Sequence, residues 1–337
     1  MPTIAAPDTS ALVDSFGRDV RYLRISLTDR CDFRCVYCMS QDMQFVPRAQ
    51  VLTLEEILTI ATAFHDLGVT KIRITGGEPL VRRNAMWLIE RLGALDALQE
   101  LVLTTNGSQL QRLAQPLRRA GVQRINISLD SLQPERFRRI TRVGDLEQVL
   151  QGIDAAQAAG FERLKINSVI LRNRNHDEVC DLVQFAVDRD MDITFIEEMP
   201  LGTIDDHDRA EAYYSSDSVR NDIERRFRLQ PSDETSGGPA RYFRIPHSRT
   251  RIGLISPHSH NFCDACNRVR LTTEGRLLLC LGQEHSVDLR HVIRSHPGDE
   301  AYLKQAIVDA MRIKPHGHDF ALTEQPVILR HMNATGG

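Results

Sequence analysis

Residues 20–38 read VRYLRISLTDRCDFRCVYC, a β-like run that leads directly into three closely spaced cysteines. The run Val20–Leu27 predicts a strand, and Cys31, Cys35 and Cys38 follow it in a C-x3-C-x2-C loop. Soft thiolates of this kind select iron–sulfur clusters or zinc. A four-iron cluster normally takes four cysteine ligands, so three on one loop would leave one iron open to an exogenous molecule. On spacing alone, a zinc site that borrows a distant ligand stays an alternative, as does a loop with incidental cysteines.

The strand-then-helix rhythm continues to about residue 200. Five further β-like runs are Thr70–Thr75, Glu100–Thr105, Arg124–Leu129, Leu164–Leu171 and Asp192–Glu197. Helical segments are expected at 53–67, 110–120, 145–159 and 177–190. The first of them opens with a capping box of Thr53 and Glu56. Six βα-type repeats at this spacing predict a parallel sheet.

Polar residues follow the carboxyl ends of several predicted strands, at 31–38, Gly76–Glu78, Asn106 and Met199. In (β/α) barrels this is the end that carries the active site. The sequence therefore predicts an α/β fold built on a partial (β/α)6 TIM-type barrel.

After Pro200 the rhythm fails, and residues 231–239 (PSDETSGGP) are rich in loop formers. We therefore expect a barrel over residues 1–240 and a smaller C-terminal region over 241–337 that binds a cluster and closes the barrel. A second cysteine triplet, Cys263-x2-Cys266-x13-Cys280, lies in that region. His258 or His260 could instead complete a structural zinc site there, and spacing alone leaves this alternative open.

Composition excludes several classes of protein. Seven cysteines, six of them in two triplets, do not resemble the scattered, even-numbered cysteines of a secreted disulfide scaffold. With 42 Lys and Arg against 45 Asp and Glu, a globally basic nucleic-acid binder is not expected. No apolar run approaches the roughly 18 residues of a membrane span, and the N-terminus shows no secretory signal. We expect a soluble cytoplasmic protein without a nucleic-acid or membrane partner.

The first triplet, with Tyr37 before its last cysteine, resembles that of the radical S-adenosylmethionine (SAM) superfamily. Thr75-Gly76-Gly77-Glu78-Pro79 matches that superfamily's GGEP element, where paired glycines let the backbone approach a ligand. Residues 262–271, FCDACNRVRL, resemble one branch, the GTP 3′,8-cyclase or molybdenum cofactor biosynthesis protein A family. The resemblance runs from Arg24 to the terminal glycines.

This resemblance implies conversion of GTP to (8S)-3′,8-cyclo-7,8-dihydroguanosine 5′-triphosphate, an early step of molybdenum cofactor biosynthesis. It implies SAM and two [4Fe–4S] clusters as cofactors, the second binding the guanine of GTP through its open iron. The implied cluster ligands are Cys31, Cys35 and Cys38, and then Cys263, Cys266 and Cys280. The implied SAM contacts are Tyr37, Gly77, Ser128 and Met199. The implied GTP contacts are Arg24, Arg73, Thr104, Lys165, Arg268 and Arg270.

The family's terminal double glycine reaches toward the active site and is needed for turnover, which implies a catalytic role for Gly336 and Gly337. Thr335 stands where the family usually has isoleucine. The charges support a triphosphate site independently, because arginine forks match phosphate oxygens. Arg268 and Arg270 alternate on an extended segment, so both point to one face. For each of the other cations, an ion pair or a surface position stays an alternative.

The resemblance also implies an external one-electron reductant, a homodimer, and hand-over of the product to cyclic pyranopterin monophosphate synthase. Two other functions stay open. One is a different radical SAM enzyme with an auxiliary cluster, such as a peptide-modifying enzyme. The other is a zinc-stabilised binding module without catalytic chemistry.

Overall fold

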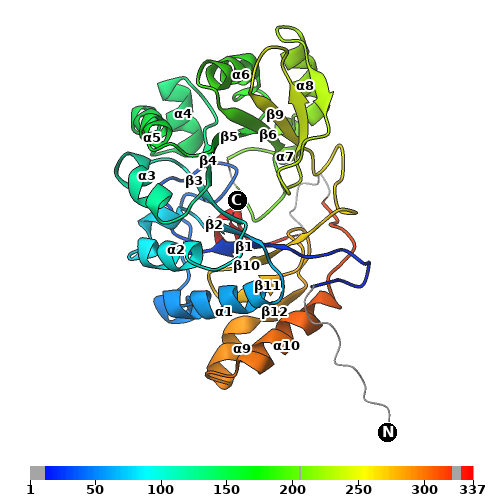
Figure 1. Ribbon diagram of the computed structural model, residues 1–337. Coiled ribbons are helices and arrows are strands. Elements are labelled where there is room, and N and C mark those ends of the chain that lie inside the picture. Colours follow the sequence, from blue (N-terminus) through cyan, green and yellow to red (C-terminus); the bar gives the residue numbers. More distant parts are fainter. Residues whose placement is uncertain (1–11, 205, 321–327, 337) are drawn as a thin grey trace.

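The computed structural model describes residues 12–204, 206–320 and 328–336, and a twelve-stranded sheet runs through it (Figure 1). Six strands in chain order form the centre of the sheet and run parallel to one another. They are β1 (Tyr22–Ser26), β2 (Lys71–Thr75), β3 (Glu100–Thr105), β4 (Arg124–Ser128), β5 (Arg163–Ile170) and β6 (Asp192–Glu197). The predicted partial barrel of six βα-type repeats is confirmed.

Helices that alternate with these strands cover the outer side of the curved sheet (Figure 1). They are α1 (Leu54–Asp66), α2 (Ala85–Gly93), α3 (Leu110–Arg119), α4 (Pro134–Thr141), α5 (Leu146–Ala158) and α6 (Val179–Asp188). β2 is buried at all five positions, as expected for a parallel strand with side chains packed on both faces.

The first helix shows how local sequence sets the boundaries of these elements. The Thr53 hydroxyl accepts a hydrogen bond from the Glu56 N–H at 3.1 Å, and the Glu56 carboxylate accepts one from the Thr53 N–H at 2.7 Å. This confirms the predicted capping box at the start of α1. Gly68 then ends the helix with a φ of 93°, a conformation that costs glycine little. The chain returns directly into β2.

Residues after β6 extend both edges of the central sheet. On one edge β9 (Arg251–Ile255) pairs in parallel with β6, followed outward by β8 (Arg241–Arg244) and β7 (Gln230–Ser232). On the other edge β10 (Arg268–Leu271) pairs in parallel with β1 and leads to β11 (Arg276–Leu278) and β12 (Ser286–Asp288). β10 thereby brings the second cysteine region beside the strand that precedes the first. The expected division at residue 240 stays a prediction.

The remaining helices are α7 (Arg209–Ala212), α8 (Ser216–Glu224), α9 (Leu289–Ser295), α10 (Glu300–Met311) and α11 (Met332–Thr335). α11 lies inside the curve of the sheet, beside β1 and β2 (Figure 1). Short 3-10 turns occupy Arg48–Gln50, Pro79–Val81 and His176–Glu178. In the part of the chain that the structure describes, no helix is both long and apolar enough to cross a bilayer.

Candidate functional site

One cavity inside the curve of the sheet brings the two cysteine triplets together. It is lined by every residue that the sequence assigned to a cluster, SAM or GTP: Arg24, Cys31, Cys35, Tyr37, Cys38, Arg73, Gly77, Thr104, Ser128, Lys165, Met199, Cys263, Cys266, Arg268, Arg270 and Cys280. The carbonyl of Gly336 contacts two of the arginines. Gly337 lies outside the described residues. Segments more than 200 residues apart in the sequence therefore share one site.

The first cysteine loop is held against the barrel by backbone hydrogen bonds. The Val36 N–H donates to the Ile140 carbonyl at 3.0 Å, which fixes the loop on α4. Asp32 accepts hydrogen bonds from Asn106 Nδ2 and Ser108 Oγ, both at 2.6 Å, which fixes it to the segment after β3. Burial raises the pKa of Cys38 to about 12. These thiols therefore need a cation if they are to be held as thiolates.

Tyr37, between the last two cysteines, is fixed by a buried carboxylate. Its hydroxyl donates to Asp130 Oδ2 at 2.7 Å, and the other carboxylate oxygen of Asp130 accepts from the Val169 N–H at 2.8 Å. Burial raises the pKa of Asp130 to about 6. Sequence reasoning missed Asp130, although it stands two residues after the end of β4, where polar site residues are expected.

The GGEP element brings bare backbone against the first cysteine loop. The Gly77 N–H donates to the Thr28 carbonyl at 2.6 Å. A Cβ at Gly77 would lie 2.4 Å from the Arg30 carbonyl oxygen, so no larger residue fits. Glu78 is buried beneath it and accepts from the Thr105 hydroxyl at 2.9 Å and the Asn106 N–H at 2.7 Å. Glu78 thus ties the element to β3 and leaves the glycine backbone facing the cavity.

The second cysteine region has cations close to its sulfurs. Lys314 is only 2% exposed, and its Nζ lies 3.5 Å from Cys266 Sγ and 2.9 Å from the Leu279 carbonyl oxygen. Burial opposes ionisation of Cys266, but Arg268 and Lys314 outweigh it and lower the pKa of this thiol. Sequence reasoning missed Lys314, because a lysine in a loop normally signals only an exposed side chain.

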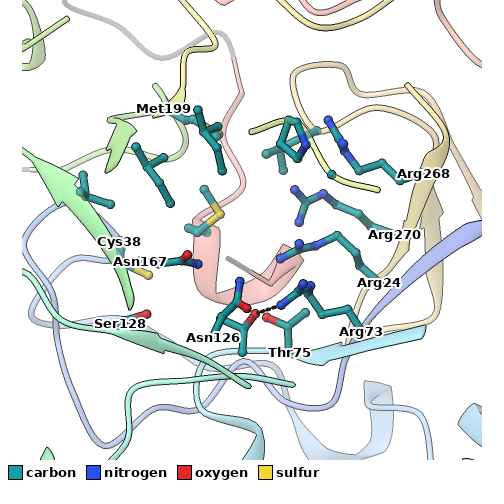
Figure 2. A pocket seen from close by; sticks show the side chains of 18 of the residues that line it. Arg24, Cys38, Arg73, Thr75, Asn126, Ser128, Asn167, Met199, Arg268 and Arg270 are labelled. Atoms are coloured by element: carbon teal, nitrogen blue, oxygen red, sulfur yellow. Dashed lines mark hydrogen bonds between the residues drawn. The ribbon is translucent and has the colours of Figure 1, made fainter. Parts of the chain in front are cut away.

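A basic group lies between the two cysteine regions. Figure 2 shows Arg24, Arg73, Arg268 and Arg270 pointing into the cavity on the side opposite Cys38. Among the described residues, no carboxylate forms an ion pair with Arg73, Arg268 or Arg270. Burial, reinforced by Arg24 and Arg268, holds the pKa of Arg270 well below its usual value. Guanidinium groups without a carboxylate partner among the described residues, as for Arg73, Arg268 and Arg270, are expected in an anion site.

Hydrogen bonds orient the members of this group. Arg73 Nη1 donates to the Thr104 hydroxyl at 2.9 Å, and Lys165 Nζ donates to the Tyr242 hydroxyl at 2.8 Å. Lys71, two residues before Arg73 on β2, also lines the cavity. Its Nζ lies 2.6 Å from Glu100 Oε2 and forms an ion pair with that carboxylate. Sequence reasoning missed Lys71, although its period-two spacing from Arg73 places both side chains on one face of the strand.

The C-terminal segment connects the two ends of the cavity. Asn333 Nδ2 donates to the Asp29 carbonyl at 2.8 Å, just before the first cysteine loop. The Gly336 carbonyl accepts from Arg24 Nη2 at 3.4 Å and from Arg270. Gly336 has a φ of 78°, and a Cβ there would meet Thr75 Cγ2 at 2.2 Å. Glycine is therefore the residue that this position requires.

The candidate metal ligands in the cavity are thiols, which suit iron–sulfur clusters or zinc. In residues 12–204, 206–320 and 328–336, no three His, Cys, Asp or Glu side chains are grouped as ligands of one metal ion. The histidines considered for a zinc site have other partners: His258 Nε2 bonds the Glu198 carbonyl and His260 Nε2 bonds Asp217, both at 2.9 Å. Two sets of three thiols facing one cavity match clusters that each keep one iron open.

Two family models together match most of the chain. Residues 25–186 match the Radical SAM superfamily, and residues 191–320 match Molybdenum Cofactor Synthesis C. The first match implies that the chain uses SAM and a [4Fe–4S] cluster. In solved structures, the chain resembles Streptococcus suis SuiB bound to S-adenosylmethionine, with a TM-score of 0.61 and 13% identity over 94% of this chain and 77% of that one. This likeness shows the fold.

Full-length relatives define the branch of the superfamily. A protein named GTP 3′,8-cyclase from Pseudomonas entomophila (strain L48) is 63% identical over 328 residues, which cover 97% of this chain and 98% of that protein. One of the same name from Pseudomonas putida (strain W619) is 60% identical over 331 residues, covering 98% and 99%. The chain therefore belongs to the GTP 3′,8-cyclase family of radical SAM enzymes.

Proposed function

We propose that this chain converts GTP into (8S)-3′,8-cyclo-7,8-dihydroguanosine 5′-triphosphate, an early step of molybdenum cofactor biosynthesis. One observation carries the proposal: two cysteine triplets and a basic group face the same cavity. When bound, SAM and a reduced cluster supply the 5′-deoxyadenosyl radical that removes the ribose 3′-hydrogen, so that C3′ can bond to C8 of guanine. The task left to the protein is to place the two reacting molecules side by side and to exclude water.

Cys31, Cys35 and Cys38 would hold the first cluster, with SAM beside Tyr37, Gly77, Ser128 and Met199. The position of Gly77 supports this assignment, because it lines the cavity and packs directly against the first cysteine loop, where no Cβ would fit. The hydrogen bond from Tyr37 to Asp130 fixes that ring against the cysteine loop. Figure 2 shows Ser128 and Met199 reaching the cavity on the same side as Cys38.

Cys263, Cys266 and Cys280 would hold a second cluster whose open iron takes the guanine base. The buried ammonium of Lys314 supports an anionic group here, because a buried charge needs a counter-charge and the neighbouring group is the Cys266 sulfur. The side chain of Arg18 braces this region, since its Nη1 donates to the Cys263 carbonyl at 2.8 Å and its Nη2 to the Pro315 carbonyl at 2.7 Å.

The basic group would bind the ribose and triphosphate of GTP. Its members Arg24, Arg73, Lys165, Arg268 and Arg270 would do so together with the Thr104 hydroxyl. The hydrogen bond from Arg73 to the Thr104 hydroxyl holds these two side chains together at the cavity. Gly336 and Gly337 would also lie close to bound GTP, because Arg24 and Arg270 donate hydrogen bonds to the Gly336 carbonyl.

Several features of the proposal rest on family membership alone. They are the external one-electron reductant, the homodimer and hand-over to cyclic pyranopterin monophosphate synthase. The division of the chain at residue 240 and a cytoplasmic location rest instead on the sequence pattern and composition. A peptide-modifying activity is disfavoured, because relatives about three-fifths identical over the full length share the name GTP 3′,8-cyclase.

The test is an anaerobic reaction of the purified chain, reconstituted with iron and sulfide, with SAM, GTP and dithionite. We expect about eight irons per chain and equal amounts of 5′-deoxyadenosine and cyclised nucleotide. Formation of 5′-deoxyadenosine with no product derived from GTP would overturn the proposed function. Zinc in place of iron would overturn both cluster assignments.

A further inference from the structure

Tyr22 lies at the base of the basic group and is not among the residues assigned so far. Its side chain is only 3% exposed. Its hydroxyl oxygen accepts from Arg73 Nε at 2.5 Å and lies 3.4 Å from Arg24 Nη1. Lys71 Nζ stands 5.0 Å from the centre of its ring. One phenol therefore contacts three cations of the GTP end.

We infer that Tyr22 is a positioning residue for the triphosphate of GTP. Its phenol oxygen orients Arg73 and Arg24, carries a counter-charge to Arg73 before the nucleotide binds, and takes up one proton from solvent when the triphosphate arrives. The inference rests on the proposed function, since it requires GTP to bind at the basic group.

The surroundings of Tyr22 explain why the oxygen would be charged. Its charged neighbours are Arg24 on β1, Lys71 and Arg73 on β2, Arg268 and Arg270 on β10, and the pair of Glu100 and Arg124 at the starts of β3 and β4. The only carboxylate in this set is Glu100, which is shared between Lys71 and Arg124. Burial alone would raise the pKa of Tyr22, but Arg73, Arg24 and Lys71 outweigh it and lower this pKa to about 6.

The arrival of the triphosphate reverses this balance. Several negative charges then lie against the same guanidinium groups, and a phenolate among them becomes a like charge in a poorly solvated site. A proton on Tyr22 removes the repulsion and leaves the oxygen able to keep its bond from Arg73. Above about pH 6, binding should therefore take up a proton, and affinity for GTP should fall as pH rises, by up to tenfold per pH unit.

The test is anaerobic calorimetry of GTP binding to the reconstituted enzyme at about pH 8, in two buffers with different heats of ionisation. The comparison of buffers gives the number of protons taken up on binding. We expect about one more proton for the wild-type chain than for Tyr22→Phe, which keeps the ring and removes the oxygen. Tyr302→Phe, at an exposed position on α10, is the matched control and should behave as the wild type.

The outcomes separate the two proposals. A wild-type chain that binds GTP without proton uptake, or a Tyr22→Phe variant with unchanged uptake and unchanged pH dependence, would overturn the role of Tyr22 alone. A wild-type chain that fails to bind GTP would overturn the proposed function itself. If the Tyr22→Phe variant does not fold, the wild-type proton uptake still decides.

Discussion

Cys35 and Cys266 line the same cavity, yet their thiols lie in opposite surroundings. Burial, with Asp130 acting in the same direction, raises the pKa of Cys35 far above its usual range. At the other end, Arg268 and Lys314 overcome burial and lower the pKa of Cys266. A buried carboxyl group, Asp130, thus acts on the thiol at the first end of the cavity, and cations act on the thiol at the second end.

This difference matches the charges of the two molecules that the family binds. SAM carries a sulfonium and an ammonium group, which carboxyl groups such as Asp130 favour. GTP carries a triphosphate, which Arg268 and its neighbours favour. Different parts of the sheet supply these surroundings: Asp130 follows β4, whereas Arg24, Arg73, Arg268 and Arg270 stand on β1, β2 and β10.

Removal of one cysteine from each end gives the largest expected contrast. Cys35→Ser should abolish formation of 5′-deoxyadenosine, because the cluster that reduces SAM loses a ligand. Cys266→Ser should keep SAM cleavage and lose the cyclised nucleotide. Each variant should retain about four of eight irons. Iron analysis and chromatography of both products measure the outcome, and cyclised nucleotide from the Cys266→Ser variant would contradict the division of roles.

Loss of one arginine should weaken only the basic end. Arg270→Gln removes a cation that faces the cavity and contacts the Gly336 carbonyl. A hydrogen bond to a charged group contributes about 1.5–3 kcal/mol, so the Kd for GTP should rise by roughly 10- to 150-fold. Binding of SAM should stay unchanged. Arg276→Gln, on the neighbouring strand and exposed, is the control for nucleotide titration. Equal weakening of SAM binding would show that the two ends are not independent.

The buried ammonium of Lys314 should tune the second cluster and leave the first unaffected. Lys314→Met keeps most of the side-chain volume but removes the positive charge beside Cys266. The reduced cluster is the more negative state, so its potential should fall, by about 60–130 mV for a loss of 1.5–3 kcal/mol. A redox titration followed by electron paramagnetic resonance measures both clusters. Lys304→Met, whose lysine pairs with Asp66 near the surface, should leave both potentials unchanged. A shift in the first cluster instead would refute the assignment.

The central barrel and most of the residues that line the cavity could be predicted from the sequence, for definite physical reasons. β3 and β6 have the predicted bounds because short apolar runs between turn formers leave little freedom in where a buried parallel strand begins. The cysteines were found by spacing, and the GTP contacts came from family resemblance. β11 and β12 were missed because three residues show no periodicity.

Lys314 and Tyr22 were missed for a different reason. The lysine lies 48 residues from Cys266 along the chain, and its burial is decided by how the segment after α10 folds back. No local pattern distinguishes it from an exposed loop lysine. Tyr22 did leave a signal, because it alternates with Arg24 on β1 and so shares its face. A tyrosine in such a strand is normally predicted to belong to the apolar core, however, and only the pairing with β2 places cations beside it.

The smallest expected effect concerns the segment that joins the two ends. Thr335 is buried in α11, and its hydroxyl donates to the Met332 carbonyl of the same helix at 3.2 Å. Thr335→Val keeps the shape and removes this bond and the weaker 3.9 Å contact of the same hydroxyl to Met332 Sδ, so turnover should stay within about threefold of the wild type. Asn333→Ala instead removes the bond to the Asp29 carbonyl and should slow cyclisation by about fivefold, the equivalent of one net hydrogen bond of about 1 kcal/mol. Measured rates of cyclised product test both. A tenfold loss in the Thr335→Val variant would instead show that the Thr335 hydroxyl contacts a bound ligand. The hydrogen bonds of α11 alone give no sign of such a contact.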